Sequence, residues 1–184
     1  MKIVPIYDGY IYSVSYDESG EEDNEFDRLL SLWNDVSYLS DFFRTNAAYL
    51  SDETWQKVRL PEMAAHQVIR EAEDLENLFE ELHDNTEKGR KPDFDSHFKY
   101  FGGKYKYMLE YEPMKSYGTE SPSLIRLYAV KLRANTYLIT GGGIKLADTI
   151  QNSPGLQDHV IRNIDRVRTY LKANGIMDSD DLED

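Results

Sequence analysis

The chain of 184 residues contains 21 lysine and arginine residues and 34 aspartate and glutamate residues, and its net charge at pH 7 is −13. It has no cysteine, which excludes disulfides, thiolate zinc sites and cysteine nucleophiles. The start of the chain lacks a secretory signal, and no apolar run reaches the roughly 18 residues that a membrane helix needs. We therefore expect a cytoplasmic protein with no membrane span.

The charge is unevenly distributed along the chain. Residues 1–98 carry 9 basic and 23 acidic side chains, residues 99–177 carry 12 basic and 6 acidic ones, and residues 178–184 carry five acidic ones. A modestly basic segment thus lies between an acidic half and an acidic tail. Nucleic-acid binding, which depends on lysine and arginine, stays compatible with that segment.

A hairpin and two helices are the first elements in chain order. Asp8-Gly9 is a strong two-residue turn signal between alternating apolar positions, so residues 2–16 predict a β-hairpin. Apolar residues recur at spacings of three and four over residues 25–49, which predicts one helix there. A proline opens a second predicted helix, residues 61–85.

The segment NTEKGRKPD has the composition of a linker. We interpret residues 1–184 as a single domain. If the chain divides, it divides at this segment, into an acidic part at 1–90 and a basic, sheet-bearing part at 99–177.

The basic part predicts three strands and a final helix. The strands are KYKYMLEYE at 104–112, SLIRLYAVKL at 123–132 and TYLIT at 136–140. Ser153 is placed to cap the N-terminus of the last helix, with Pro154 at its first position and Asn174-Gly175 as its stop.

This order of elements predicts an α+β fold. Strands and helices do not alternate strictly, and the last three strands follow one another closely. We therefore expect an antiparallel sheet with an N-terminal hairpin, two helices before the main strands and one C-terminal helix.

Three consecutive glycines follow the third of these strands. The run GGGIKL lacks the glycine spacing and the hydroxyl residue of a nucleotide-hydrolase phosphate loop, and it is no dinucleotide fingerprint. We expect Gly141, Gly142 and Gly143 to form a bulge or bend that ends the strand, with positive φ or a close backbone approach.

The surrounding motif resembles the C-terminal half of HigB-type toxins, in the RelE/ParE superfamily. Arg126 matches an arginine that opens a strand, Gly143 a strand-ending glycine, Ile144 an aromatic position and Lys145 the first of two lysines. Leu146 stands where that pattern has the second lysine. The resemblance covers about residues 104–172, and a related family of uncharacterised bacterial proteins is the alternative assignment.

The resemblance implies ribosome-dependent cleavage of messenger RNA, in which a ribose 2′-hydroxyl attacks the adjacent phosphate. It implies Arg126 and Lys145 as the electrostatic pair, and Tyr128, on the same strand face as Arg126, as a group that stacks on a base or moves a proton. The implied partners are the ribosome with its mRNA and an antitoxin. The other interpretation of these residues is an ion pair or solvated face for the basic side chains and sheet packing for Tyr128.

No cofactor and no metal is expected, because the four histidines have no ligand spacing. A second hypothesis is a non-catalytic interaction or regulatory protein on a toxin-like scaffold, which works through its acidic surface. The net charge and the loss of the second lysine at Leu146 motivate it.

Overall fold

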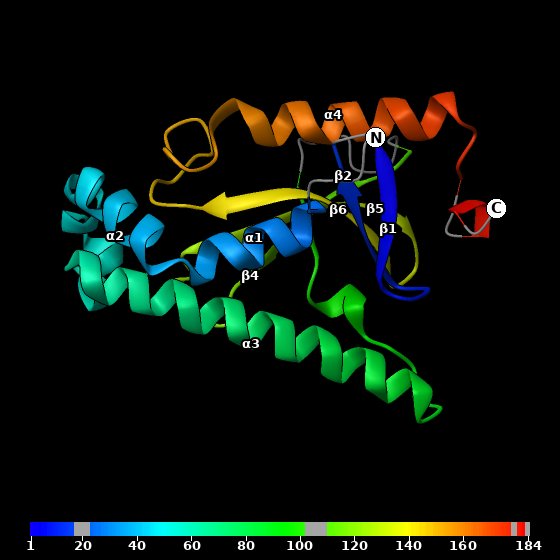
Figure 1. The fold of residues 1–184 in the computed structure, drawn as a ribbon, viewed down its shortest axis with the longest axis horizontal. Helices are drawn as coiled ribbons and strands as arrows, with labels where there is room; N and C mark the ends of the chain where they lie inside the picture. Colours follow the sequence, from blue (N-terminus) through cyan, green and yellow to red (C-terminus); the bar gives the residue numbers. More distant parts are fainter. Residues whose placement is uncertain (17–22, 102–109, 178–179, 183–184) are drawn as a thin grey trace.

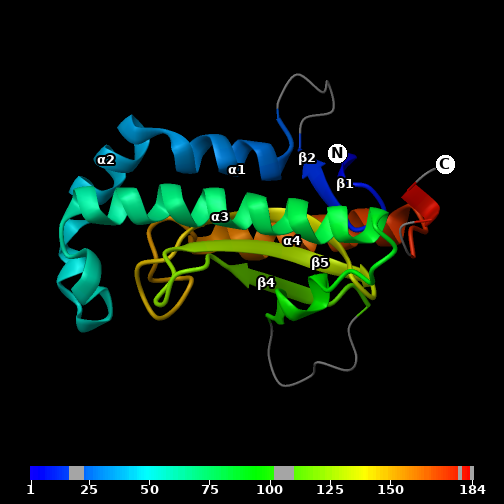
Figure 2. The ribbon, with the colours of Figure 1, turned by 90° about the horizontal axis from the view of Figure 1, so that it is seen from below.

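The computed structural model describes residues 1–16, 23–101, 110–177 and 180–182. A sheet lies between two helical layers (Figures 1 and 2). Helix α4, Gln157–Ala173, covers one face, while α1, Glu25–Asn34, and the long α3, Pro61–Glu87, cover the other.

The sheet has six strands in the order β1-β2-β6-β5-β4-β3. They are β1 Lys2–Tyr7, β2 Ile11–Ser15, β3 Lys99–Tyr100, β4 Pro113–Tyr117, β5 Ile125–Arg133 and β6 Thr136–Ile144. All neighbours are antiparallel except β2 and β6, so the sheet is mixed. The α+β class is confirmed, and the parallel pair among the described strands arises because the N-terminal hairpin docks on β6.

The predicted hairpin is confirmed. Gly9 has φ 78° between β1 and β2, a conformation that costs glycine nothing because it has no Cβ. Along the strands, side chains alternate between two cores: Ile125 and Leu127 face α1 and α3, whereas Tyr128 and Val130 face α4.

The single helix predicted over residues 25–49 is wrong. The segment forms two helices, α1 and α2 (Val36–Thr45), with non-helical Asp35 between them. The Asp35 carboxylate accepts the backbone N–H of Ser37 at 2.8 Å and of Tyr38 at 3.0 Å, and so caps α2. The apolar spacing continues through the break, so periodicity alone did not reveal it. Two short 3₁₀ helices, Ala47–Ser51 and Glu53–Val58, then lead to α3.

Helix α3 begins at the predicted proline and ends two residues beyond the predicted end. Apolar side chains of α3, such as Phe79, belong to the same core as Leu127 of β5. The acidic and basic parts of the sequence therefore share a core. A further 3₁₀ turn, Phe94–Ser96, precedes β3.

The strand predicted over 104–112 falls largely on residues 102–109, outside the described residues. Strand β4 follows it at Pro113 and was not predicted. The other two predicted strands are confirmed as β5 and β6, each longer than expected.

The glycine run does not end its strand, because β6 continues through it to Ile144. The predicted bulge is present: Tyr128 pairs with Gly141 but Ala129 pairs with Ile139, which leaves Thr140 as the extra residue. Gly141 has φ 149°.

Both neighbouring layers approach the backbone of β6 at the glycines. A Cβ on Gly142 would lie 2.5 Å from the carbonyl oxygen of Arg126 and 2.8 Å from Leu29 of α1. A Cβ on Gly143 would overlap the carbonyl oxygen of Gly155, in the loop that leads to α4. The predicted close backbone approach is therefore confirmed.

The predicted N-terminus of the last helix is wrong, and its C-terminus is confirmed. Helix α4 begins at Gln157 with no side-chain cap, because Ser153 is buried and uses its hydroxyl within the preceding loop. At the other end Gly175 has φ 67°, and the N–H of Ile176 donates to the carbonyl of Leu171 at 3.0 Å.

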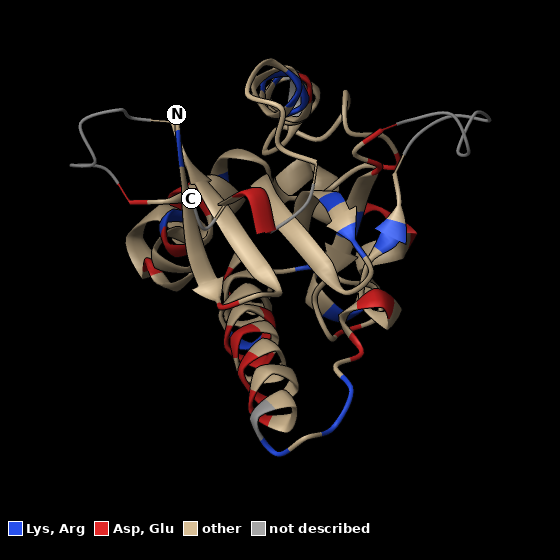
Figure 3. Cartoon of the chain, turned by 90° about the vertical axis from the view of Figure 1, so that its right-hand side faces the viewer, with Lys and Arg blue, Asp and Glu red and all other residues tan. Residues whose placement is uncertain are grey.

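Charge is segregated in the fold as well as in the sequence. Acidic positions recur along α3, the helix that ends at the bottom of Figure 3, and basic ones follow in the connection after it. Of the helices within the described ranges, none has the length and apolar character needed to cross a membrane.

We predict that Gly142→Ala lowers the free energy of unfolding by about 2–3 kcal/mol, because the new methyl group must displace backbone and a packed leucine. Gly89→Ala is the comparison, since Gly89 has φ 74° but open space around it. That variant should lose only about 1 kcal/mol, the cost of the backbone conformation. Urea denaturation of both variants measures the difference, and equal losses would contradict the packing argument.

A candidate nucleic-acid site at the start of β5

Basic and aromatic side chains form two cross-strand rows on the α4 face of the sheet. In one row Lys99 pairs with Lys115, and Lys115 pairs with Tyr128. In the other, Tyr117 pairs with Arg126. Directly opposed residues of antiparallel strands point to the same face, so the register brings together side chains that lie far apart in the sequence.

Three cations surround the ring of Tyr117. The Arg126 guanidinium carbon lies 4.2 Å from the ring centroid, and the Nζ atoms of Lys99 and Lys115 lie at 5.2 and 5.5 Å. These are cation–π distances, and the stacked arginine is the closest of the three.

Within the described ranges, Lys99, Lys115, Arg126 and Lys145 form no ion pair with a carboxylate. The far end of β5 differs, because Arg133 there pairs with Asp180 at 2.9 Å. The four cations therefore form a cluster without close ion pairs, which we call the basic cluster. The alternative interpretation of Arg126 as an ion-pair partner is therefore not met among the described residues.

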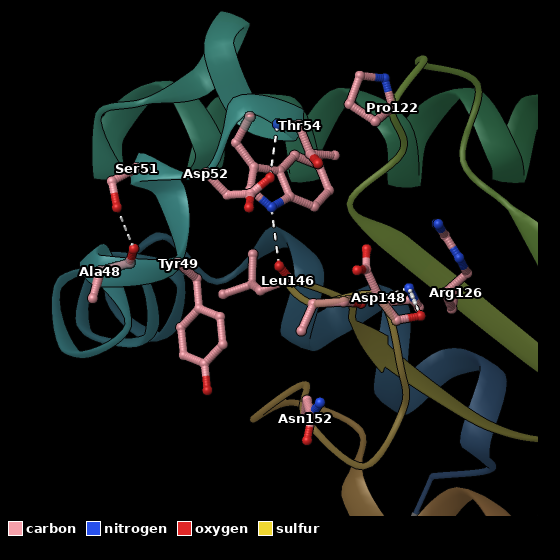
Figure 4. Close-up of a pocket in the computed structure, with 13 residues that line it drawn as sticks. Ala48, Tyr49, Ser51, Asp52, Thr54, Pro122, Arg126, Leu146, Asp148 and Asn152 are labelled. Carbon is pink, nitrogen blue, oxygen red and sulfur yellow. Dashed lines mark hydrogen bonds between the residues drawn. The ribbon is translucent and has the colours of Figure 1, made fainter.

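Arg126 lies where three hollows meet. The wide hollow, about 450 Å³, lies between the 3₁₀ turns before α3 and the loop after β6, and Tyr49, Asp52, Asp148 and Asn152 line it with Arg126 and Lys145 (Figure 4). The small hollow, about 240 Å³, is lined by Arg126, Tyr128, Lys145, Lys115 and Phe101, among others. The edge hollow, about 420 Å³, includes His97, Lys99 and Tyr117. The three residues predicted from sequence, Arg126, Tyr128 and Lys145, therefore converge on the small hollow.

A buried carboxylate fixes the start of β5. Glu71 of α3 is 0% exposed and accepts the N–H of Leu124 and of Ile125, each at 3.0 Å. Gln67 and Ser123 also donate to it, at 2.7 and 3.1 Å. Burial raises the pKa of Glu71, while these donors favour the charged form.

The Arg126 side chain is half-buried and held by backbone. One of its nitrogens, Nη1, donates to the carbonyls of Ser123 at 3.0 Å and Ile125 at 2.6 Å. Burial lowers the pKa of Arg126, but a guanidinium stays charged at any physiological pH. Glu71 orders the segment that supplies these carbonyls, so it positions Arg126 indirectly.

Lys145 is shared between the loop and the hollows. Its Nζ donates to the carbonyl oxygens of Ala147 at 2.6 Å and Asp148 at 2.9 Å, which leaves one of its three N–H bonds for a ligand. Burial and the neighbouring charges of Arg126 and Lys115 lower the pKa of Lys145. The lysine is therefore a better proton donor than an exposed one.

The loop that carries these groups is tied to both layers. The Ser153 hydroxyl accepts the N–H of Ala147 at 3.0 Å and donates to the carbonyl of Thr149 at 3.0 Å. The Trp55 indole donates to the carbonyl of Leu146 at 3.0 Å. Leu146 itself is buried, so the position of the missing second lysine belongs to the core.

Tyr128 is in the site but only 1% exposed. Its ring packs edge-on against Phe101 at 5.1 Å, and burial raises its pKa to about 12. A hydroxyl of this kind holds its proton at neutral pH. Its surroundings favour packing over proton transfer.

Tyr117 is a residue of the site that sequence reasoning missed. Burial by itself raises the pKa of Tyr117. The hydrogen bond from Lys115 and the charges of Lys115, Arg126 and Lys99 together lower it by more, so the pKa lies below its ordinary value. The pattern MKSY gives a weak strand signal, and only the register with β5 reveals that Tyr117 faces three cations.

Among the described residues, no group of three or more histidine and acidic side chains could hold a metal ion. Comparisons with family models, with curated proteins and with solved structures found no match to this chain.

We predict that Glu71→Gln lowers the free energy of unfolding by about 2 kcal/mol, because an amide NH₂ would face backbone donors that the carboxylate now satisfies. Glu73→Gln, at an exposed position of the same helix, is the control and should change stability by less than about 0.5 kcal/mol. Chemical denaturation checks both variants. A stable Glu71→Gln protein would show that this carboxylate does not hold the start of β5.

Proposed function

We propose that the protein binds RNA at the basic cluster and cleaves it, as the resemblance to HigB-type toxins implies. The observation that carries this proposal is the convergence of four cations without ion-pair partners on hollows that share Arg126, beside a tyrosine with a lowered pKa. A phosphodiester supplies the negative charge that such a cluster lacks.

In the proposed reaction the ribose 2′-oxygen attacks the adjacent phosphorus while the bond to the 5′-oxygen breaks. The 2′-hydroxyl proton passes to the ionised form of Tyr117, and Lys145 gives a proton to the departing 5′-oxygen. The products are a 2′,3′-cyclic phosphate and a 5′-hydroxyl. Arg126 and Lys115 stabilise the charge that develops on the phosphorane.

These roles differ from the sequence prediction in two respects. Tyr117 takes the proton transfer that the resemblance assigned to Tyr128, because its pKa shifts downward and that of Tyr128 shifts upward. Arg126 keeps its electrostatic role, whereas Lys145 becomes the proton donor and Lys115 takes its place beside Arg126. The proposed substrate is messenger RNA on the ribosome, and an antitoxin is the proposed regulatory partner.

A second function is supported by α3. Its exposed face presents six acidic side chains: Glu73, Asp74, Glu76, Glu80, Glu81 and Asp84. A basic protein partner would associate with this face at a rate that falls as salt rises, and the Arg126→Ala variant would bind it as well as wild type does. Salt-dependent binding of such a partner, without cleavage of RNA, would favour the non-catalytic function.

We predict that expression of the chain in bacteria produces new mRNA ends in phase with codons, and that Arg126→Ala reduces them about 100-fold or more. Arg133→Ala is the matched control, because Arg133 lies on the same strand outside the three hollows. Mapping of 5′ ends by sequencing measures the effect. Absence of phased ends with the wild-type chain would rule the proposal out.

We also predict a bell-shaped pH dependence of cleavage by purified protein on ribosomes. The rate rises as Tyr117 ionises, since only the phenolate accepts a proton, and falls at higher pH as Lys145 loses its proton. Tyr117→Phe should be about 100-fold slower and lack the rising limb. Tyr128→Phe is the control and should keep the rising limb. If Tyr128→Phe loses the rising limb and Tyr117→Phe keeps it, the proton acceptor is Tyr128.

A further inference from the structure

The wide hollow contains polar groups that the proposed cleavage does not use. The side chains of Asp148, Asn152 and Tyr49 line it and make no hydrogen bond to the described part of the chain. Asp52 also lines it, but its carboxylate already accepts the N–H of Thr54 at 2.8 Å. All three side chains are exposed to solvent, so they are available to a ligand in this cavity.

These groups lie close to the cations. In the view of Figure 4, Tyr49 and Arg126 lie on opposite sides, with Asp148 and Asn152 between them. The carbonyl of Asp148 accepts Nζ of Lys145, and the charge of its carboxylate raises the pKa of that lysine. A carboxylate acceptor and two cationic donors thus share the cavity, with an aromatic ring at its far side.

This set of groups matches the edge of one nucleobase. Guanine presents two adjacent N–H donors, at N1 and N2, which fit the two oxygens of a carboxylate. Beside them it presents the O6 and N7 acceptors, which fit arginine or lysine. A volume of about 450 Å³ is within the usual size of ligand pockets.

The other bases fit less well. Adenine has an amino donor but no carbonyl acceptor for the cations. Uracil has a single N–H between two carbonyls, and cytosine places its N3 and O2 acceptors where they would face a carboxylate. Adenine and uracil would each offer the two oxygens of Asp148 one donor instead of two, and cytosine would place acceptors against them, so each makes fewer hydrogen bonds in the hollow than guanine does.

We propose that the wide hollow is a guanine-binding pocket that selects the nucleotide next to the cleaved bond. Asp148 accepts from N1–H and N2–H, while Arg126 donates to O6 through Nη2, because its backbone contacts use only Nη1. Lys145 keeps its remaining N–H for the departing 5′-oxygen. Asn152 bonds the sugar or the remaining base edge, and Tyr49 supplies an aromatic wall. As a specificity determinant for cleavage, this inference rests on the proposed ribonuclease function.

Isothermal titration of the full chain with GMP, IMP and AMP, each to millimolar concentration, tests the pocket. IMP is guanine-like but lacks the N2 amino group, so it isolates the second bond to Asp148. We expect GMP to bind about tenfold more tightly than IMP, the discrimination typical of one bidentate contact, and AMP to bind more weakly still. Asp148→Ala should abolish the difference between GMP and IMP.

Asp41→Ala, at an exposed position of α2, is the control and should leave all three affinities unchanged. Equal binding of the three nucleotides, or no saturable binding of GMP, would overturn the inference. Phased cleavage that depends on Arg126 but shows no guanine selectivity would leave the ribonuclease function standing without this pocket. Selective GMP binding without cleavage would leave the guanine pocket standing without the ribonuclease function.

Discussion

The fold depends on a short stretch of β6 that has no side chains. Gly142 and Gly143 let α1 and the loop before α4 approach the strand from opposite sides, to distances at which any Cβ would meet backbone atoms. A central strand with ordinary side chains would hold both layers further away. The loop after β6 would then shift, and with it Lys145 and the rim of the wide hollow.

The site forms where three separately stabilised segments meet. Glu71 fixes the backbone before Arg126, Ser153 and Trp55 fix the loop that contains Lys145, and the β4–β5 register fixes Tyr117. None of these contacts is itself between charged groups of the basic cluster. The cations are therefore held near one another by hydrogen bonds and packing, which work against their mutual repulsion.

This arrangement separates acidic and basic charge within one chain. Six acidic side chains of α3 are exposed to solvent, whereas the basic cluster lies on the sheet face that α4 also covers. A chain with a net charge of −13 can thus present a locally positive hollow to an anion. The negative remainder would limit nonspecific attraction to nucleic acid, which depends on long-range charge.

The sequence by itself determined the class of fold, the hairpin turn at Gly9, the start of α3 and the end of α4, because these follow from local patterns. A short motif also predicted that Arg126, Tyr128 and Lys145 lie together, and all three line the small hollow. The tertiary structure alone decided the break at Asp35, the late start of α4, the continuation of β6 through the glycines and the contacts of Glu71 and Tyr117. All of these features have the same physical reason, because each depends on which residues face one another across helices or strands. The buried carboxylate of Glu71 on α3 and the ring of Tyr117 on β4 acquire their partners only when packing and strand register bring them together.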